Sequence, residues 1–277
     1  MRALQRVSDW PVDHVTAVVI RPGRPPEIFG DPDHVYRLAS ISKPLAAWAA
    51  LVAVEEGIVT LDDPPRGVEV QAGCTLRHLL SHAGGYAFDG AVPISPPGRR
   101  RIYSNAGFEL VAAEVESASG MSFEQYLREA VFEPLGMQAS ELRGSAAHGV
   151  WATTGDLARF ASELMRSQLL APPTTAEAIR PQYADLSGIV PGVGSFTPCP
   201  WGLGVEIHGA KHPHWMGRDN SPEAFGHFGG AGTMMWVDPI ADCALVALTD
   251  RPTDDWMTDA LTLWPDLSDA VLAEVAA

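Results

Sequence analysis

Residues 44–54 read PLAAWAALVAV, a run without a single charge that ends at Glu55, Glu56 and Gly57. Nearly all of these residues are good helix formers, and glycine after glutamates is a typical helix end. A helix that is apolar on every side cannot face water, so it must be buried between other layers. The run therefore predicts a layered fold built around one enclosed helix.

Strand patterns lie toward both ends of the chain. Val15–Ile20 is an apolar, β-branched run, and the turn RPGRPP joins it to Glu27-Ile28-Phe29, which predicts a β-hairpin. Further strand patterns come late, at 201–207 (WGLGVEI), 232–237 (GTMMWV) and 244–249 (ALVALT). We expect a last helix over 259–277, broken at Pro265.

Helical patterns fill the middle, beginning at Thr75, Asn105, Ser122 and Asp156. Ser122 with Gln125 predicts a capping box, and Thr154 is the expected cap of the last of these helices. The order of strands, helices, strands and helix predicts an α+β fold, with an antiparallel sheet from both chain ends and an inserted helical lobe. We expect one domain over 1–277, with an α/β lobe at about 1–60 and 195–277 and a helical lobe at about 61–194.

Charge and composition exclude some partners. Nineteen basic residues against thirty-four acidic ones give a net charge of −15, which disfavours nucleic acid and anionic membranes as partners. The first twenty residues lack a signal-peptide pattern, and no later run is long and uncharged enough to span a bilayer, so we expect a cytoplasmic protein. The cysteines, an odd number at wide spacing, predict buried thiols; they are Cys74, Cys199 and Cys243.

Residues 38–44, LASISKP, combine a helix start with Lys43, the only lysine in the first two hundred residues. Serine as a cap and proline in the first turn account for part of the pattern, but not for the lysine. Ser40 and Lys43 are three apart and share one face of a helix, so the hydroxyl and the amine can meet. A lysine can activate a serine only if its pKa falls from about 10.4, and the apolar helix that follows supplies the burial.

Ser-x-x-Lys is a weak pattern by itself, but further motifs follow it in order. These motifs are VAVEEGIVTLDDP at 52–64, HLLSHAGG at 78–85, Pro97-Gly98 ahead of Tyr103-Ser104-Asn105, PLGM at 134–137, TTGDLARF at 153–160, WGLG at 201–204 and His227-Phe228-Gly229. With them the chain resembles the serine β-lactamase and penicillin-binding protein superfamily, in particular the branch of class C β-lactamases, D-aminopeptidases and family VIII-type esterases.

The resemblance implies the β-lactamase/transpeptidase-like fold and the roles of three catalytic residues. Ser40 is implied to be the acylated nucleophile, Lys43 its base or proton shuttle, and Tyr103 a general base that can become a phenolate and later activate water. A cationic lysine near a tyrosine of pKa about 10 would stabilise such a phenolate.

The same resemblance implies substrate-binding residues. Asn105 would orient a substrate amide or the lysine, and His227 would line the strand side of the cleft. The backbone N–H groups of Ser40 and Gly230 would form an oxyanion hole, and Gly229 together with Gly230 would let a strand approach the acyl group closely.

These implications predict a serine hydrolase that acts through an acyl-enzyme on small esters or amides, with weak β-lactamase or D-aminopeptidase activity as a further expectation. The partner is a small-molecule substrate, and no cofactor or metal is expected. Many penicillin-recognising relatives carry lysine where this chain has His227, so we expect a preference for uncharged acyl groups. The alternative is a non-catalytic penicillin-binding or sensor-like protein, against which the joint retention of Ser40, Lys43, Tyr103 and Asn105 argues.

Other polar clusters have two interpretations. His78 and His82 have zinc-pair spacing without a matching carboxylate motif, so a structural role is favoured. Irregular spacing favours solvated side chains over metal ligands for His208, His212 and His214. The run Arg99–Arg101 either rims the cleft or is a solvated loop, and the solvated loop is favoured.

Overall fold

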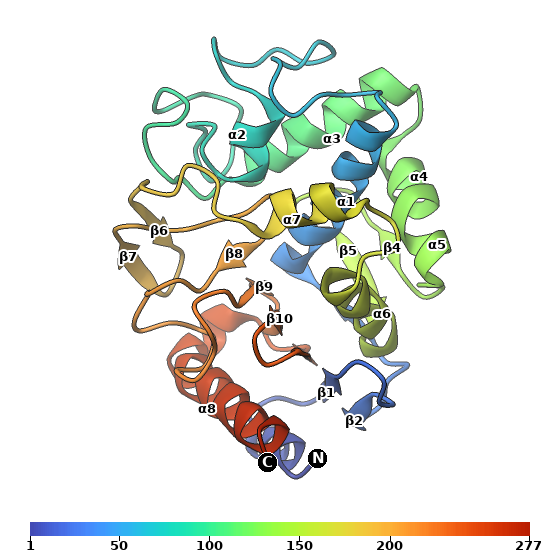
Figure 1. The fold of residues 1–277 in the computed structure, drawn as a ribbon, viewed down its shortest axis with the longest axis vertical. Coiled ribbons are helices and arrows are strands. Elements are labelled where there is room, and N and C mark those ends of the chain that lie inside the picture. The colour runs from blue at the N-terminus through green and yellow to red at the C-terminus, as the bar shows by residue number, and fades with distance from the viewer.

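A six-stranded antiparallel sheet forms the centre of the computed structural model, which describes residues 1–277. Its strand order, β2-β1-β11-β10-β9-β8, places the N-terminal hairpin beside the last strand of the chain (Figure 1). The prediction of an α+β fold with a sheet from both chain ends is confirmed. The strands are β1 (Val15–Ile20), β2 (Glu27–Phe29), β8 (Glu206–Ile207), β9 (Phe225–Gly229), β10 (Thr233–Asp238) and β11 (Cys243–Thr249).

Both faces of the sheet are buried at β1, β10 and β11, and alternate residues of these strands enter different cores. In β1, Ala17 and Val19 pack with the helix α8 (Met257–Val275) and the N-terminal 3₁₀ helix η1 (Ala3–Asp9). Val18 and Ile20 belong to the larger core on the opposite face, which the helices of the middle region complete. The two chain ends meet at α8, where Glu274 accepts hydrogen bonds from the backbone of Arg2 and Ala3 at 3.0 and 2.6 Å (Figure 1).

The apolar helix is α1 (Ser42–Glu55), and it is enclosed as predicted. Its Trp48 is fully buried and meets Phe160 of α6 (Thr154–Met165) edge to face at 5.9 Å between ring centroids. α6 lies against β1 and β11, so α1 is the inner layer between α6 and the remaining helices. Those are α2 (Leu76–Leu80), α3 (Asn105–Ser119), α4 (Phe123–Leu127), the π-helical turn η3 (Arg128–Phe132), α5 (Glu133–Leu135) and α7 (Pro172–Ile179).

Two small sheets complete the fold. In one, β3 (Val35–Arg37) pairs with β5 (Val150–Thr153), and β5 pairs with β4 (Glu141–Leu142). This sheet joins the segment before the predicted nucleophile to the helical region. The other is a hairpin of β6 (Gly188–Val190) and β7 (Gly194–Phe196). The division into an α/β lobe and a helical lobe remains a proposal.

Three local predictions are wrong. The cap of α6 is Thr153, whose Oγ1 accepts from the backbone of Asp156 at 3.1 Å, so Thr154 is already helical. α8 is not broken at Pro265, because the buried face carrying Trp264 and Leu267 holds the helix to the sheet on both sides of it. The strand predicted over 201–207 is limited to β8, because Trp201 forms only isolated β-bridges.

The predicted capping box at α4 is half formed. Ser122 Oγ accepts from the backbone N–H of Gln125 at 3.2 Å, but the Gln125 side chain donates to Glu129 instead of returning to the cap. The three cysteines are free and buried, as predicted. None of the helices combines the length and the apolar character needed to cross a bilayer.

Candidate active site

Ser40 lies in the 3₁₀ turn η2 (Ala39–Ile41), which joins β3 to α1. Ala39, directly before it, has a φ of +47°, a conformation that is strained for a residue with a side chain. Thr233 of β10 donates from Oγ1 to Leu38 O at 2.9 Å and so ties this turn to the central sheet. The serine is therefore held on a rigid, strained connection, and not within the helix itself.

Lys43 is fully buried in the first turn of α1, and its Nζ has three oxygen neighbours. These are Asn105 Oδ1 at 2.7 Å, Ala147 O at 3.0 Å and Ser40 Oγ at 3.3 Å. No carboxylate pairs with it, whereas Lys211, the other lysine of the chain, forms a buried ion pair with Glu206 at 2.6 Å. Burial lowers the pKa of Lys43 to about 7, although the charges of Glu109 and Asp89 oppose the shift.

Tyr103 comes from the segment before α3 and faces His227 of β9, with 3.4 Å between its Oη and His227 Nε2. Lys43 Nζ lies 4.7 Å from the centroid of the Tyr103 ring. Burial raises the pKa of the Tyr103 hydroxyl well above its usual value, and an interaction with Ser40 opposes this only in part. Tyr103 is therefore a neutral phenol in the free protein, and it can act as the implied general base only after its hydroxyl has lost a proton.

His227 is buried and neutral. Burial, together with the nearby charge of Lys43, lowers its pKa to about 3. Its Nδ1–H donates to Phe228 O at 2.6 Å, so Nε2 carries the lone pair that faces the hydroxyl of Tyr103. The ring therefore supplies no positive charge to the strand side of the cleft.

Asn105 is the first residue of α3 and connects the lysine to an acid. Its Oδ1 accepts from Lys43, and its Nδ2 donates to Asp89 Oδ1 at 3.0 Å. Of the two roles left open for Asn105, the structure displays the contact with the lysine. Asp89 had no place in the sequence analysis, because nothing in its neighbourhood marks it as a partner of an asparagine sixteen residues later.

The end of β9 runs close to the serine turn. A Cβ on Gly229 would lie 2.2 Å from Leu38 O and 3.2 Å from Ser40 N, so only glycine fits there. Gly230 follows, and its carbonyl accepts from Thr253 N at 2.9 Å while its N–H has no backbone partner. The structure thus brings all seven predicted residues together around one point.

His82 is the residue whose importance the sequence analysis missed. It is buried, and it holds the backbone on both sides of Tyr103: its carbonyl accepts from Ile102 N at 2.8 Å, and its Nδ1 accepts from Ser104 N at 3.1 Å. Its ring also packs on the Tyr103 ring at 4.5 Å between centroids. Burial keeps its pKa well below the usual value, so the ring is neutral, and its φ is +57°.

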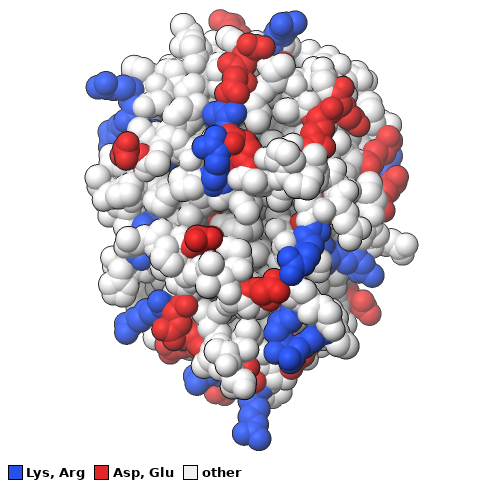
Figure 2. Space-filling model, viewed as in Figure 1, with Lys and Arg blue, Asp and Glu red and all other residues white.

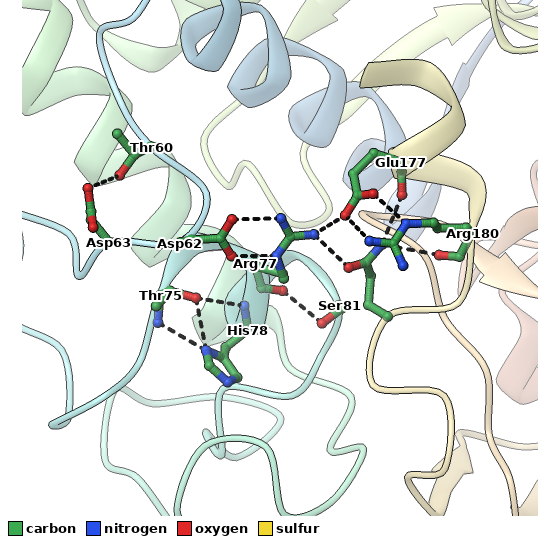
Figure 3. Close-up of polar contacts among 10 residues, drawn as sticks. Thr60, Asp62, Asp63, Thr75, Arg77, His78, Ser81, Glu177 and Arg180 are labelled. Atoms are coloured by element: carbon green, nitrogen blue, oxygen red, sulfur yellow. Dashed lines mark hydrogen bonds and ion pairs between the residues drawn. The ribbon is translucent and has the colours of Figure 1, made fainter. Parts of the chain in front are cut away.

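Helix α2, which leads to His82, is anchored by Arg77 (Figure 3). Arg77 binds Asp62 with Nε and Nη2 at 2.6 and 2.8 Å, and its Nη1 reaches Glu177 of α7. His78 belongs to the cap of this helix, because its Nδ1 lies 2.9 Å from Thr75 Oγ1 and 3.3 Å from Thr75 N. His78 and His82 therefore have structural roles, as favoured.

The expectation of solvated side chains is wrong for His208 and His214, which are buried, whereas His212 is exposed. His214 Nε2 donates to Glu206 Oε1 at 2.9 Å while its Nδ1 accepts from the backbone of Met216 at 3.1 Å. No group of three or more histidine, cysteine, aspartate or glutamate side chains in the chain is arranged to hold a metal ion.

The site opens into a cleft with a volume of about 290 Å³ next to Ser40. Trp201, which the sequence places in a strand pattern and in the WGLG motif without a role of its own, forms one wall and meets His227 at 5.5 Å between ring centroids. The solvated loop favoured for the arginine run is wrong for Arg101, which is buried, while Arg99 and Arg100 are exposed. Arg100 and Arg101 both line an adjoining cavity. The remaining lining is largely apolar and comprises Phe88, Val190, Pro191, Gly192, Phe228, Thr253, Asp254 and Met257.

Comparison with known proteins agrees with this geometry. The sequence profile of the Beta-lactamase family matches residues 21–264. The chain belongs to the Beta-lactamase family. A crystal structure of a beta-lactamase from Mycobacterium bovis is 47% identical, with a TM-score of 0.95, covering 99% of this chain and 100% of that one. The predicted β-lactamase/transpeptidase-like fold is thereby confirmed.

Other proteins to which the chain is similar carry different names. The D-alanyl-D-alanine-carboxypeptidase/endopeptidase AmpH of Escherichia coli is 25% identical, over 86% of this chain and 75% of its own length. Penicillin-binding protein 4* of Bacillus subtilis is 29% identical, but the match covers only 39% of this chain and 30% of that protein. Simvastatin synthase from Aspergillus terreus shares the fold, with a TM-score of 0.79 at 19% identity, covering 98% of this chain and 97% of that one. In the first curated relatives, the region matched by this chain spans only 30 and 60% of their own length.

Proposed function

We propose that this protein hydrolyses small esters or amides through an acyl-enzyme on Ser40, with Lys43 as the base that activates it. One observation carries the proposal: Lys43 Nζ is fully buried, without a carboxylate partner, among three oxygens. A neutral amine has two N–H donors and one lone pair. With the donors on Asn105 Oδ1 and Ala147 O, the lone pair is left for the proton of Ser40.

Acylation follows from this arrangement. Neutral Lys43 takes the proton of Ser40, and Oγ attacks the carbonyl carbon of the substrate. The backbone N–H groups of Ser40 and Gly230 stabilise the negative oxygen that forms. The Lys43 ammonium then returns a proton through the hydroxyl of Tyr103 to the leaving group, and the acyl group remains on Ser40.

Deacylation uses the same groups in reverse. Lys43, neutral again, takes a proton through Tyr103 from a water molecule that attacks the acyl carbonyl. Oγ of Ser40 leaves and recovers its proton. In the free protein, His227 Nε2 accepts from the Tyr103 hydroxyl and holds the phenol in place beside Lys43.

Neutral His227 also shapes the choice of substrate. It supplies no fixed positive charge on the strand side of the cleft, so a carboxylate next to the scissile bond gains little there. We infer that the enzyme hydrolyses penicillins and cephalosporins weakly compared with uncharged acyl esters. A sensor-like protein that is acylated without turnover would have the same contacts, and only turnover separates the two.

The test compares kcat/KM for 4-nitrophenyl butyrate and for a chromogenic cephalosporin, between about pH 5.5 and 8.5, in the wild type and in His227→Lys. We expect faster ester hydrolysis by the wild type, and relatively better cephalosporin hydrolysis by the variant. Stable adducts without product release would identify a sensor. Efficient cephalosporin hydrolysis by the wild type would refute the substrate preference.

A further inference from the structure

The cleft beside Ser40 is the first of two connected chambers. The inner chamber, of about 290 Å³, contains Ser40, Tyr103 and His227. The outer chamber, of about 440 Å³, lies between the segment 100–103 and the β6–β7 hairpin. Phe88, Tyr103 and Pro191 line both, so a substrate that reaches Ser40 can extend past Tyr103 into the outer chamber. The volume of the outer chamber falls within the range of ligand pockets.

The walls of the outer chamber are apolar and open to solvent. Phe88, Ile94 and Ile189 line it and are 50, 63 and 55% exposed, and Val92, near Ile94 on the same loop, is 74% exposed. These are four of the eight large apolar side chains exposed anywhere on the protein. Such a concentration on one rim indicates a surface that is covered when a ligand binds.

Beyond the apolar walls the cleft becomes cationic. Arg100 lines the outer chamber and also a shallow recess further out, where Arg99 joins it. Neither arginine forms an ion pair or a side-chain hydrogen bond, and no carboxylate lines the outer chamber or the recess. Figure 2 shows basic side chains projecting at the edge that carries the loops between α2 and α3 in Figure 1.

A third, buried arginine adds positive charge to this end of the cleft. Arg101 is 2% exposed and donates only to backbone carbonyls, those of Ser81, Gln182, Tyr183 and Cys199, so no acid neutralises its charge. Burial lowers its pKa only to about 10, and the guanidinium stays positive at neutral pH. The protein has a net charge of −15, but three consecutive unpaired arginines make this end of the cleft positively charged.

We propose that the substrates are amphiphilic: an apolar segment next to the scissile ester or amide fills the outer chamber, and an anionic group at its far end meets Arg99 and Arg100. This inference rests on the proposed function and names the substrate class. It limits the preference for uncharged acyl groups to the part of the substrate next to the scissile bond, because the anionic group lies at the end of the cleft away from β9 and neutral His227. The anion can be a carboxylate, a sulfate or a phosphate on a freely dissolved molecule.

Binding of octyl sulfate and of 1-octanol to the full-length protein tests the proposal without any need for turnover. We expect the sulfate to bind more tightly, and Arg100→Gln to weaken it by about three- to tenfold without changing octanol binding. The effect should shrink as salt rises, because both partners are exposed to solvent. Arg24→Gln, an equally exposed and unpaired arginine in the β1–β2 turn, is the matched control and should change nothing.

A kinetic comparison locates the effect at the catalytic site. We expect mono-4-nitrophenyl suberate to have a higher kcat/KM than 4-nitrophenyl octanoate, mainly through KM, and Arg100→Gln to remove the advantage. Equal binding of sulfate and octanol, or an advantage that survives Arg100→Gln, overturns the proposal while hydrolysis by Ser40 stands. Binding to phosphatidylglycerol vesicles with no binding of monomeric octyl sulfate also overturns it.

Discussion

Replacing Asn105 by aspartate should move the pH at which the enzyme becomes active. The new carboxylate would lie where Oδ1 now accepts from Lys43 Nζ, at 2.7 Å. An opposite charge at such a distance raises the pKa of an amine by about 1 to 3 units. For Lys43, whose pKa is about 7, this places the new value at roughly 8 to 10.

The sign of the effect on rate follows from the proposed role. Neutral Lys43 is the active form, so kcat/KM of the wild type should rise with pH through about 7 and then level off. In Asn105→Asp, the neutral fraction at pH 7 falls from about a half to between about 10 and 0.1%, which predicts a loss of about five- to five-hundredfold. The loss should disappear at high pH.

Asp89 requires a control. Asn105 Nδ2 donates to Asp89 Oδ1 at 3.0 Å, so the single variant would place two carboxylates together. The exchange Asn105→Asp with Asp89→Asn restores one amide and one acid at the same two positions. If kcat/KM at high pH falls in either variant while the pH of half-maximal kcat/KM stays at the wild-type value, Lys43 is not the base.

Other predictions concern the residues that support this centre. Tyr103→Phe should reduce kcat by about 10² to 10⁴ with little change in stability, and a tenfold loss or less in steady-state assays would make Tyr103 a packing residue. His82→Phe leaves the Ser104 N–H without an acceptor, so the free energy of unfolding, measured by chemical denaturation, should fall by about 1 to 3 kcal/mol, and kcat should fall as well. His82→Asn keeps an acceptor and tolerates the positive φ, so it should retain most of the stability. Arg77→Ala should cost about 1 to 3 kcal/mol of unfolding free energy, and Arg180→Ala, whose side chain is 58% exposed, less than about 1 kcal/mol; equal losses would count against the anchor described for α2.

Much of the fold could be predicted, because its elements are marked by local patterns. Val15–Ile20 and the late strands are apolar enough to belong to a sheet covered on both faces, and the uncharged run of α1 requires enclosure. The exact bounds of helices and strands depend on tertiary contacts, which local patterns do not contain. α8 continues through Pro265 because its buried face is held by the sheet, which no pattern around that proline expresses.

The residues of the candidate site also differ in whether the sequence predicts them. Ser40 and Lys43 are close in sequence, so helical spacing alone predicts that they meet, while Tyr103 and His227 could be joined to them only through the resemblance of several motifs. The role of His82 depends on its hydrogen bonds to both sides of Tyr103, and a histidine in an apolar helix end does not reveal them. The cationic end of the cleft likewise depends on which arginine of a run of three is buried.

The central claim is that Ser40 is the nucleophile and is activated by neutral Lys43. The most direct measurement is the intact mass of the protein after incubation with a fluorophosphonate, followed over pH and located by peptide mapping. The account predicts a single adduct on Ser40, formed at a rate that rises with pH through about 7, and no adduct on Ser40→Ala, whose kcat should fall by about 10⁴ to 10⁶. Labelling of Ser40→Ala at the wild-type rate, or an adduct on another residue, would contradict it.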